Sequence, residues 1–270
     1  MNSYELFKQE CAAEVGAQGA DADLRAQTRD WFNHANAHKY SYHFEMLGRP
    51  IIQYPQDIVA MQELIWQIKP DLIIETGIAH GGSLILSASM MAMLDYCDAV
   101  QQGVVLDPAN PVRKVLGIDI DIRDHNKQAI LAHPMASRIE MIQGSSVAPD
   151  IVFKVKEFAK EFQRIMVVLD SNHTHDHVLA ELDAYAPLTS KGSYCVVFDT
   201  VIEDLPEDAF PNRPWGKGDN AKTAVWEYLK SLSNSVVVGN DGQPFNLEID
   251  HHLEDKLLIT VAPDGFLKRV

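Results

Sequence analysis

Hydrophobic residues along this 270-residue chain gather in short, continuous runs instead of alternating with polar residues. A continuous run of strand length indicates a strand that is buried on both faces, as in a parallel sheet covered by helices. Such runs occupy residues 71–75, 114–121, 138–144, 164–170 and 193–199. Stretches of helical composition lie before and between them, at residues 58–68, 83–96, 125–132, 148–162 and 177–185.

The regular alternation of strands and helices predicts an α/β fold. We expect a Rossmann-like, doubly wound and mostly parallel seven-stranded sheet with helices on both of its faces. The tail, residues 245–252 and 256–270, predicts an antiparallel C-terminal strand pair with a turn near Asp264. Residues 1–60 are helical and aromatic and fall outside the alternation. We therefore predict that residues 1–60 form a substrate cap or an oligomer contact, and that residues 61–270 form the main domain.

The composition narrows the class of protein. Lys and Arg number 23 against 38 Asp and Glu, a formal net charge of −15, and no basic cluster offsets it, so nucleic acid is a poor partner. No apolar run reaches the ~18 residues of a membrane span, and the polar N-terminus does not read as a secretory leader. The 3 cysteines show no CxxC spacing, which argues against disulfides and zinc clusters. We expect a cytoplasmic protein without a membrane span.

A glycine-rich turn follows the first of these strands, where residues 75–83 read ETGIAHGGS. A phosphate-binding loop needs GxxxxGK[ST] and a dinucleotide site needs GxGxxG, but here the spacing is G-x-x-x-G-G with Ala79 in the middle. Ligands of parallel sheets bind at the carboxyl ends of the strands. The turn, together with Asp119 at the end of a later strand, favours S-adenosylmethionine (SAM), because an acid there can accept both ribose hydroxyls. A tight turn without a ligand is the alternative.

Acidic residues and histidines gather in the stretch LDSNHTHDHV. Asp170 ends a strand at the ligand-binding edge, so we predict a functional role for its carboxylate. His173 and His175 have the spacing of two metal ligands, but a polar loop that caps the next helix explains the same residues. We expect Asp176 to be the N-cap of a helix that begins at His177.

Several ordered motifs resemble one known family. ETGIAHGGS, VLGIDIDIR, IQGSS, VVLDSNHTHDHV and the ending KLLITVAPDGFLKRV are similar to the cephalosporin hydroxylase-like family, which includes rhamnosyl O-methyltransferases. The resemblance extends from about Gly48 to Val270. It implies the fold of class I SAM-dependent methyltransferases and, as in catechol O-methyltransferases, a divalent metal beside the methyl donor.

The resemblance also implies roles for individual residues. His173 stands where catechol O-methyltransferases carry a lysine base, and His175 is the alternative base. An imidazole suits a base that works near neutral pH. The implied cofactor-binding residues are Glu75, Gly77, Gly81 and Ser83 at the methionine part of SAM, Asp119 at the ribose, Ser146 at the adenine, and Asp170.

A magnesium ion held by Asp170 and Asp199 would bind vicinal hydroxyls of the acceptor and lower the pKa of one of them. Relatives in this family carry an acid pair where this chain reads Phe198-Asp199. Phenylalanine cannot bind magnesium, so one carboxylate is missing. We expect Glu203 or Asp204 to supply the oxygen if the loop folds back; otherwise the metal is weakly held or absent.

We therefore predict a SAM-dependent, metal-assisted O-methyltransferase that acts on a hydroxyl of a sugar or another natural-product small molecule. One alternative is a non-haem iron hydroxylase that uses His173, His175 and a carboxylate, which the parallel fold disfavours; another is a non-catalytic protein that binds an adenosine ligand. The acceptor should lie between the sheet edge, the N-terminal aromatic segment and the loop of residues 203–220, and we expect a homo-oligomer. Aromatic candidates for the acceptor site are Tyr40, Tyr42, Phe44, His80 and Trp215.

Overall fold

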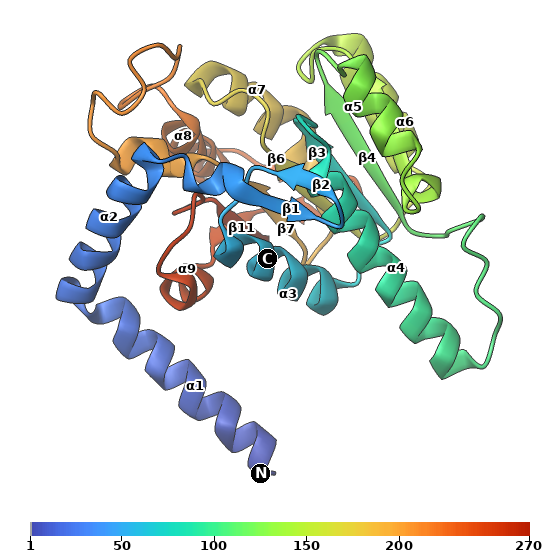
Figure 1. Ribbon diagram of the computed structural model, residues 1–270, viewed down its shortest axis with the longest axis horizontal. Coiled ribbons are helices and arrows are strands. Elements are labelled where there is room, and N and C mark those ends of the chain that lie inside the picture. Colours follow the sequence, from blue (N-terminus) through green and yellow to red (C-terminus); the bar gives the residue numbers. More distant parts are fainter. Residues whose placement is uncertain (1) are drawn as a thin grey trace.

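In the computed structural model, which describes residues 2–270, seven strands form one sheet in the order β10-β11-β7-β6-β3-β4-β5 (Figure 1). The strands from β3 to β7 run parallel to one another, and β11 lies antiparallel to both of its neighbours. Their bounds are β3 (Leu72–Thr76), β4 (Lys114–Asp119), β5 (Ile139–Gln143), β6 (Ile165–Leu169), β7 (Tyr194–Val197), β10 (Leu247–Ile249) and β11 (Phe266–Arg269). The predicted α/β class, the mostly parallel seven-stranded sheet and the C-terminal strand pair are confirmed.

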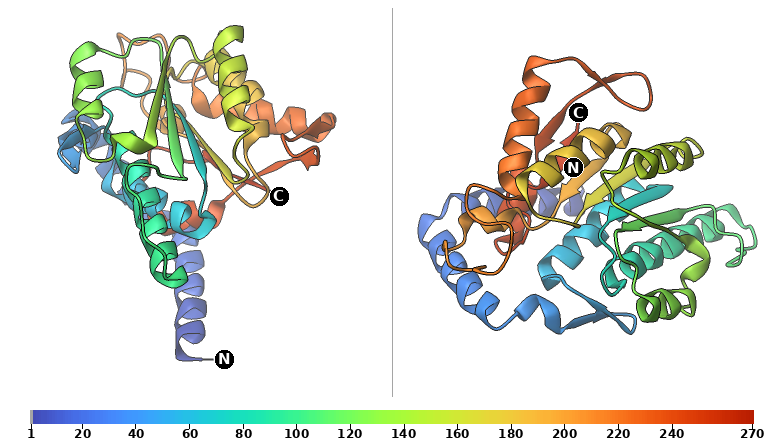
Figure 2. Two further views of the ribbon diagram at one scale, coloured as in Figure 1. Left: turned by 90° about the vertical axis from the view of Figure 1, so that its right-hand side faces the viewer. Right: turned by 90° about the horizontal axis from the view of Figure 1, so that it is seen from above.

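Two apolar clusters cover the two faces of the sheet, and helices lie on both sides of it (Figure 2). Within β3, Ile73 belongs to one cluster and Leu72 and Ile74 to the other, because successive side chains of a strand point to opposite faces. This double burial explains the continuous apolar runs. Helices α3 (Pro55–Ile68), α4 (Gly82–Gln102), α5 (Asp124–Leu131) and α9 (His251–Leu257) contribute to the first cluster, and α6 (Pro149–Ala159), α7 (His175–Tyr185) and α8 (Ala221–Asn234) to the second.

Some helix bounds differ from the predicted ones. Helix α3 begins earlier, since Pro55 occupies its first turn, where a missing N–H costs no hydrogen bond. Helix α7 begins at His175 with Thr174 as its N-cap, so the prediction of Asp176 as the cap was wrong. Helix α4 extends to Gln102; by length and composition alone it would suffice to cross a membrane, but its first half packs into the core.

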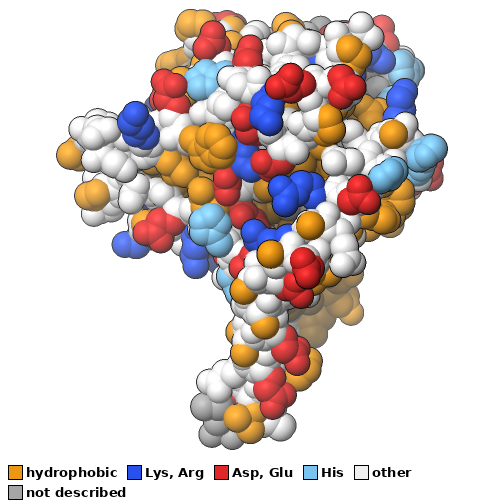
Figure 3. Space-filling model, turned by 90° about the vertical axis from the view of Figure 1, so that its left-hand side faces the viewer, with side chains coloured by type: hydrophobic (Ala, Val, Ile, Leu, Met, Phe, Trp, Pro, Cys, Tyr) orange, Lys and Arg blue, Asp and Glu red, His pale blue; other side chains and the backbone are white. Residues whose placement is uncertain are grey.

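The N-terminal segment folds as two helices and a small hairpin: α1 (Ser3–Ala20), α2 (Ala22–Ala37), the 3-10 helix η1 (Tyr40–His43), β1 (Phe44–Met46) and β2 (Arg49–Ile51). Helix α1 projects from the body of the molecule (Figure 1). At the C-terminal end of α1, Gln18 Nε2 donates to the backbone oxygen of Asp255 in α9 (2.7 Å). On the face shown in Figure 3, basic side chains lie among acidic ones. The predicted boundary after residue 60 falls inside α3, and the division into two functional parts stays a prediction.

The tail differs in part from the predicted strand pair. Strands β10 and β11 are antiparallel, but residues 251–257 form α9 and residues 258–261 are not a strand. Asp250 explains the difference, because its carboxylate accepts a hydrogen bond from Leu253 N (3.1 Å) and so caps a helix. A further short hairpin of β8 (Val237–Val238) and β9 (Pro244–Phe245) was not predicted.

Three neighbouring strands end at the same level. Thr76 at the end of β3 is in register with Ile118 of β4 on one side and with Leu169 of β6 on the other. The chain order reverses at β3, and ligands of doubly wound sheets bind in the crevice at such a point. The residues that follow at this edge are Gly77, Asp119 and Asp170.

A buried carboxyl at the start of α3 should make the stability pH-dependent. Asp57 accepts hydrogen bonds from Thr260 Oγ1 and from Val261 N, and burial raises the pKa of its carboxyl to about 7. In the unfolded chain the pKa of an aspartate is about 4. The protonated Asp57 therefore stabilises the fold fully below pH ~4, and this contribution is lost as the pH rises toward the pKa of the folded protein. The loss amounts to about 4 kcal/mol.

Asp57→Asn lacks this ionisation. Its free energy of unfolding relative to the wild type should therefore rise by about 4 kcal/mol between pH ~4 and pH ~7, as measured by urea unfolding at each pH. Two stability curves that stay parallel over this range would contradict the assignment.

Candidate active site

The glycine turn between β3 and α4 packs against the protein's own backbone. Gly77 and Gly81 have φ angles of +89° and +84°, which favour glycine. A Cβ on Gly77 would overlap the carbonyl oxygen of Asp170, and a Cβ on Gly82 would overlap that of Pro50. The glycines therefore let the loop after β6 and strand β2 approach the turn closely.

Polar groups hold the turn from several sides. Asp119 Oδ2 accepts hydrogen bonds from two successive backbone N–H groups of the turn, at 2.8 and 3.3 Å. On the carbonyl side, Asn126 Nδ2 donates to Ala79 O (2.8 Å), and Arg49 donates to His80 O through Nε (3.0 Å) and Nη2 (2.6 Å). Side chains of the protein therefore hold the turn from both its N–H and its carbonyl side.

The residues predicted at the methionine part of SAM divide into two groups. Gly77 and Ser83 line the cavity described below, whereas Glu75 lies buried behind the turn, where Ser87 Oγ donates to its carboxylate. Burial raises the pKa of Glu75 to about 7, although hydrogen bonds from Ser87 and Ser83 oppose this shift. Gly81 is the N-cap of α4 and packs against Ile130. Glu75 and Gly81 therefore support the turn from behind.

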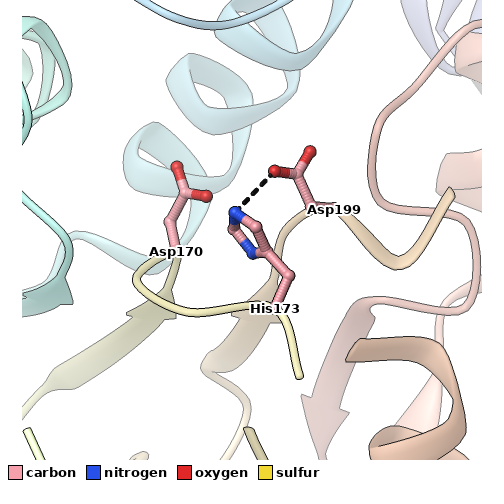
Figure 4. A group of neighbouring side chains, drawn as sticks. All are labelled: Asp170, His173 and Asp199. Atoms are coloured by element: carbon pink, nitrogen blue, oxygen red, sulfur yellow. Dashed lines mark ion pairs between the residues drawn. The ribbon is translucent and has the colours of Figure 1, made fainter. Parts of the chain in front are cut away.

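Asp170, His173 and Asp199 converge at the tips of β6 and β7 (Figure 4). One potential ligand atom of each residue lies within 4.8 Å of the other two. His173 Nε2 is 2.9 Å from Asp199 Oδ2. Gln53, just before α3, donates through Nε2 to Asp170 Oδ2 (3.3 Å). The structure thus brings together the residues predicted as the base and as the metal ligands.

The charges in this cluster shift one another's pKa values. Burial raises the pKa of Asp170 well above its ordinary value, and the nearby charge of Asp199 raises it further. Burial alone would lower the pKa of His173, but Asp199 and Asp170 outweigh this effect, so the pKa of His173 is raised. The two carboxylates stabilise positive charge between them.

Phe198 does not take part in the cluster. Leu169 of β6 is level with Val197 of β7, so Phe198 follows β7 at the height at which Asp170 follows β6. The Phe198 side chain is buried in the first apolar cluster. Asp199 then adopts a left-handed φ of +57° and contacts His173. One carboxylate therefore reaches the site from the tip of β7.

The acids expected to replace the missing carboxylate lie elsewhere. Glu203 Oε2 accepts hydrogen bonds from Gly218 N (2.7 Å) and Asn220 Nδ2 (2.6 Å). Asp204 pairs with Lys222 of α8 (2.6 Å). Both acids hold the loop that leads into α8, so the prediction that one of them completes the metal site was wrong. His173 is the third member of the cluster instead.

His175 and Ser146 also lie outside the cluster. His175 contacts α8, with Nδ1 2.8 Å from Thr223 Oγ1 and Nε2 3.2 Å from Glu227 Oε2, so its position does not support a role as the alternative base. Ser146, predicted at the adenine, is buried, and its Oγ lies 3.1 Å from Nε2 of His177.

A cavity of about 310 Å³ borders the cluster. Its walls are the glycine turn, the N-terminal segment and the loop after the 3-10 helix η4 (Thr200–Asp204), which is the place predicted for the acceptor. Tyr42, His80 and Trp215 line it. The other two candidates, Tyr40 and Phe44, are not among the residues that line it and pack against each other, with ring centroids 5.0 Å apart.

Three polar atoms of residues that line the cavity have no hydrogen-bond partner within residues 2–270: Gln53 Oε1, Tyr54 Oη and Trp215 Nε1. A buried polar atom left without a partner costs about 1–3 kcal/mol. The Trp215 ring stands edge-on to His173, with centroids 4.8 Å apart, and Arg213 lies over it (5.1 Å). Each of these buried atoms therefore has hydrogen-bonding capacity that no group within residues 2–270 uses.

The fold is that of Rossmann-like methyltransferases. A solved structure of CmcI with Mg and SAM matches it with a TM-score of 0.52 and 17% sequence identity, over 85% of this chain and 77% of that one. At this level of identity the similarity concerns the fold alone.

Residues 38–270 match the family described as Rhamnosyl O-methyltransferase/CmcI. The rhamnosyl O-methyltransferase of Mycobacterium tuberculosis is 30% identical over 217 residues, which cover 79% of this chain and 73% of the relative. That of Mycobacterium leprae is 29% identical over 224 residues, which cover 83% and 82%. The chain therefore belongs to the rhamnosyl O-methyltransferase/CmcI family, and the predictions of this family and of an O-methyltransferase are confirmed.

Gly77→Ala tests the close approach at the turn, with Gly48→Ala as its matched control. Both glycines have a left-handed φ, +89° and +85°, but a Cβ on Gly48 would meet nothing within 4 Å. Gly48→Ala should lower the free energy of unfolding by about 1 kcal/mol, and Gly77→Ala by about 2–4 kcal/mol because it also displaces Asp170, as measured by chemical denaturation. Equal losses would mean that backbone conformation alone requires a glycine at this turn.

Proposed function

We propose that the protein transfers the methyl group of SAM to a hydroxyl of a sugar-type small molecule. The observation that carries this proposal is the cluster of Asp170, His173 and Asp199, which borders a cavity beside the glycine turn. Membership of the family supports the reaction class, and the name of the curated relatives supports a rhamnosyl acceptor.

The glycine turn fits SAM, which supplies a methyl group activated by its sulfonium. The Asp119 carboxylate accepts hydrogen bonds from three backbone N–H groups, so about one of its four acceptor sites is left for a ribose hydroxyl. Helix α4 begins without a side-chain cap, and its first N–H groups can bind the carboxylate of the cofactor. The CmcI structure of the same fold was solved with SAM, in keeping with this assignment.

The donor set fits magnesium, which would lower the pKa of a bound acceptor hydroxyl. Asp170 and Asp199 offer carboxylate oxygens, the ligands that magnesium prefers, and two carboxylates suffice because this ion keeps several waters. The burial and repulsion that raise the pKa of Asp170 are also what a bound cation relieves. The Mg in the CmcI structure is consistent with this proposal.

His173 is the base in this proposal. With SAM bound, its neutral imidazole would accept the proton of the acceptor hydroxyl as that oxygen takes the methyl group, and S-adenosylhomocysteine (SAH) would be the leaving group. Asp199, 2.9 Å from Nε2, stabilises the imidazolium that results. The raised pKa of His173 reflects the same interaction.

The polar atoms without partners support an acceptor rich in hydroxyl groups. Gln53 Oε1 can accept a hydrogen bond, Trp215 Nε1 can donate one, and Tyr54 Oη can do either. Gln53 also contacts Asp170, so a hydroxyl bound to its free oxygen would lie close to the cluster. A vicinal diol of a sugar would provide two adjacent hydroxyls, one for the transfer and one for Gln53.

The geometry disfavours the iron hydroxylase. That activity needs two histidines and a carboxylate at one metal, whereas His175 contacts Thr223 and Glu227 instead of joining His173. A non-catalytic adenosine-binding protein would bind SAM and SAH but form no methylated product, so a turnover assay separates it from the transferase.

A cytoplasmic location and a homo-oligomer stay proposals that rest on the sequence. The exposed Tyr4 and Phe7 of the projecting helix α1 support an oligomer contact. Light scattering coupled to size-exclusion chromatography would reject it by showing a monomer at micromolar concentration.

Asp170→Asn should separate metal-assisted chemistry from cofactor binding. We expect turnover, measured as SAH formed with methyl α-L-rhamnopyranoside, to fall about 100-fold or more, while the Kd for SAH changes by less than about threefold. Asp204→Asn, which removes an acid outside the cluster, should keep turnover near that of the wild type. EDTA should abolish turnover and magnesium restore it; full activity in EDTA would remove the metal from the proposal.

Gln53→Leu should weaken binding of the acceptor. We expect its KM for the rhamnoside to rise about three- to tenfold, because a hydrogen bond to the substrate is lost, with a smaller effect on kcat. Gln56→Leu is the matched control, since Gln56 Oε1 also lacks a partner within residues 2–270 but its side chain does not line the cavity. Equal increases of KM in the two variants would exclude a specific role for Gln53.

A further inference from the structure

A second polar cluster lies next to the site and has no part in the proposed chemistry. Nε2 of His177 is 3.1 Å from Ser146 Oγ, 3.2 Å from Ser171 Oγ and 3.4 Å from Glu181 Oε1. Ser171 Oγ also donates to Glu181 Oε1 (2.7 Å). Three oxygen atoms therefore approach one imidazole nitrogen, which carries either a single N–H or a single lone pair.

Glu181 is fully buried in α7, which is costly for a carboxylate. One of its oxygens interacts with Ser171 and His177, and the other, Oε2, has no partner within the described residues 2–270. His177, one helical turn before Glu181, stabilises this buried carboxylate, and Glu181 in turn holds the imidazole ring in place.

The arrangement is not that of a nucleophilic triad. In a Ser–His–acid triad the serine and the acid bind different ring nitrogens, so that the proton of the serine can enter the ring while the acid stabilises the charge. Here both serines and Glu181 approach Nε2 of His177. The cluster can orient its members, but it cannot activate a serine by that route.

His177 joins two loops whose strands are not neighbours in the sheet. Ser146 follows β5 and Ser171 follows β6, and strands β3 and β4 lie between β5 and β6. Strands β5 and β6 therefore share no direct ladder of backbone hydrogen bonds, and the sheet fixes their spacing only through β3 and β4. Tyr185 Oη donates to the backbone oxygen of Ser146, so α7 holds this loop by its backbone as well as by its side chain.

The two loops carry different parts of the site. Ser146 stands at the predicted adenine side, and Ser171 directly follows Asp170 and lines the cavity. A cofactor that reaches from one loop to the other binds best when their spacing is set in advance, because no ordering is then needed on binding.

We propose that His177, anchored by Glu181, is a positioning residue that sets the distance between the adenine side of the cofactor site and the loop of Asp170. This inference rests on the proposed function, since it assumes that a SAM-type cofactor spans both loops. It assigns to α7 a role in cofactor affinity that is separate from proton transfer and from the metal.

The test is the affinity of the metal-free protein for SAH, measured by calorimetry without an acceptor. His177→Leu should raise the Kd about three- to tenfold, the value of one or two neutral hydrogen bonds. His177→Gln places an amide near the position of Nε2 and should restore most of the affinity. His175→Leu is the matched control, because the two histidines are similarly buried, at 21% and 20% side-chain exposure, and the ring nitrogens of His175 contact Thr223 and Glu227 of α8. It should leave the Kd within about twofold of the wild type.

A Kd for His177→Leu within twofold of the wild type, or an equal loss in His175→Leu, would overturn the proposal. If His177→Leu does not fold, Ser146→Ala, Ser171→Ala and the double variant replace it. Their effects on the Kd should be non-additive, and additive effects would overturn the proposal as well. A wild type that fails to bind SAH at all would instead reject the proposed function, so the two failures are distinguishable.

Discussion

The shared register of β3, β4 and β6 is the constraint on which the site depends. Thr76, Ile118 and Leu169 are level, so the next residues of three strands emerge side by side at one edge. Because Gly77 has no side chain, the carbonyl of Asp170 can approach it closely. Asp119, at the end of β4, accepts a hydrogen bond from the same turn. The acids and the glycine turn are therefore neighbours because parallel ladders align them, although they lie far apart along the chain.

Much of this arrangement could be predicted from the sequence. Continuous apolar runs that end in acids indicate strands buried on both faces, and the tips of such strands meet at one edge. This reasoning located Asp119 and Asp170 correctly beside the glycine turn, and the resemblance to a family pointed to His173 and Asp199 as well. The local sequence pattern was enough here because the sheet is parallel and each strand contributes a residue at its end or directly after it.

The rest depended on contacts between distant residues. Glu203 has the charge of a metal ligand, but its carboxylate accepts hydrogen bonds from Gly218 and Asn220 instead. Nothing in the local sequence around Glu203 indicates these contacts. Asp250 stops the predicted tail strand by capping α9, a choice that single-residue propensities do not decide. The partners of His177 come from the loops after β5 and β6 and from α7, so the cluster exists only once these elements have packed.

The hydrogen bonds from Arg49 to the glycine turn have a consequence for protein engineering. Arg49 binds the carbonyl of His80, and the backbone of Pro50 lies against Gly82, so strand β2 forms part of the support of the cofactor turn. Grafting a foreign N-terminal hairpin to change acceptor selectivity would alter this support at the same time. The stretch between Leu205 and Trp215 contacts the cavity without buttressing the turn, and it is the safer place for diversified libraries.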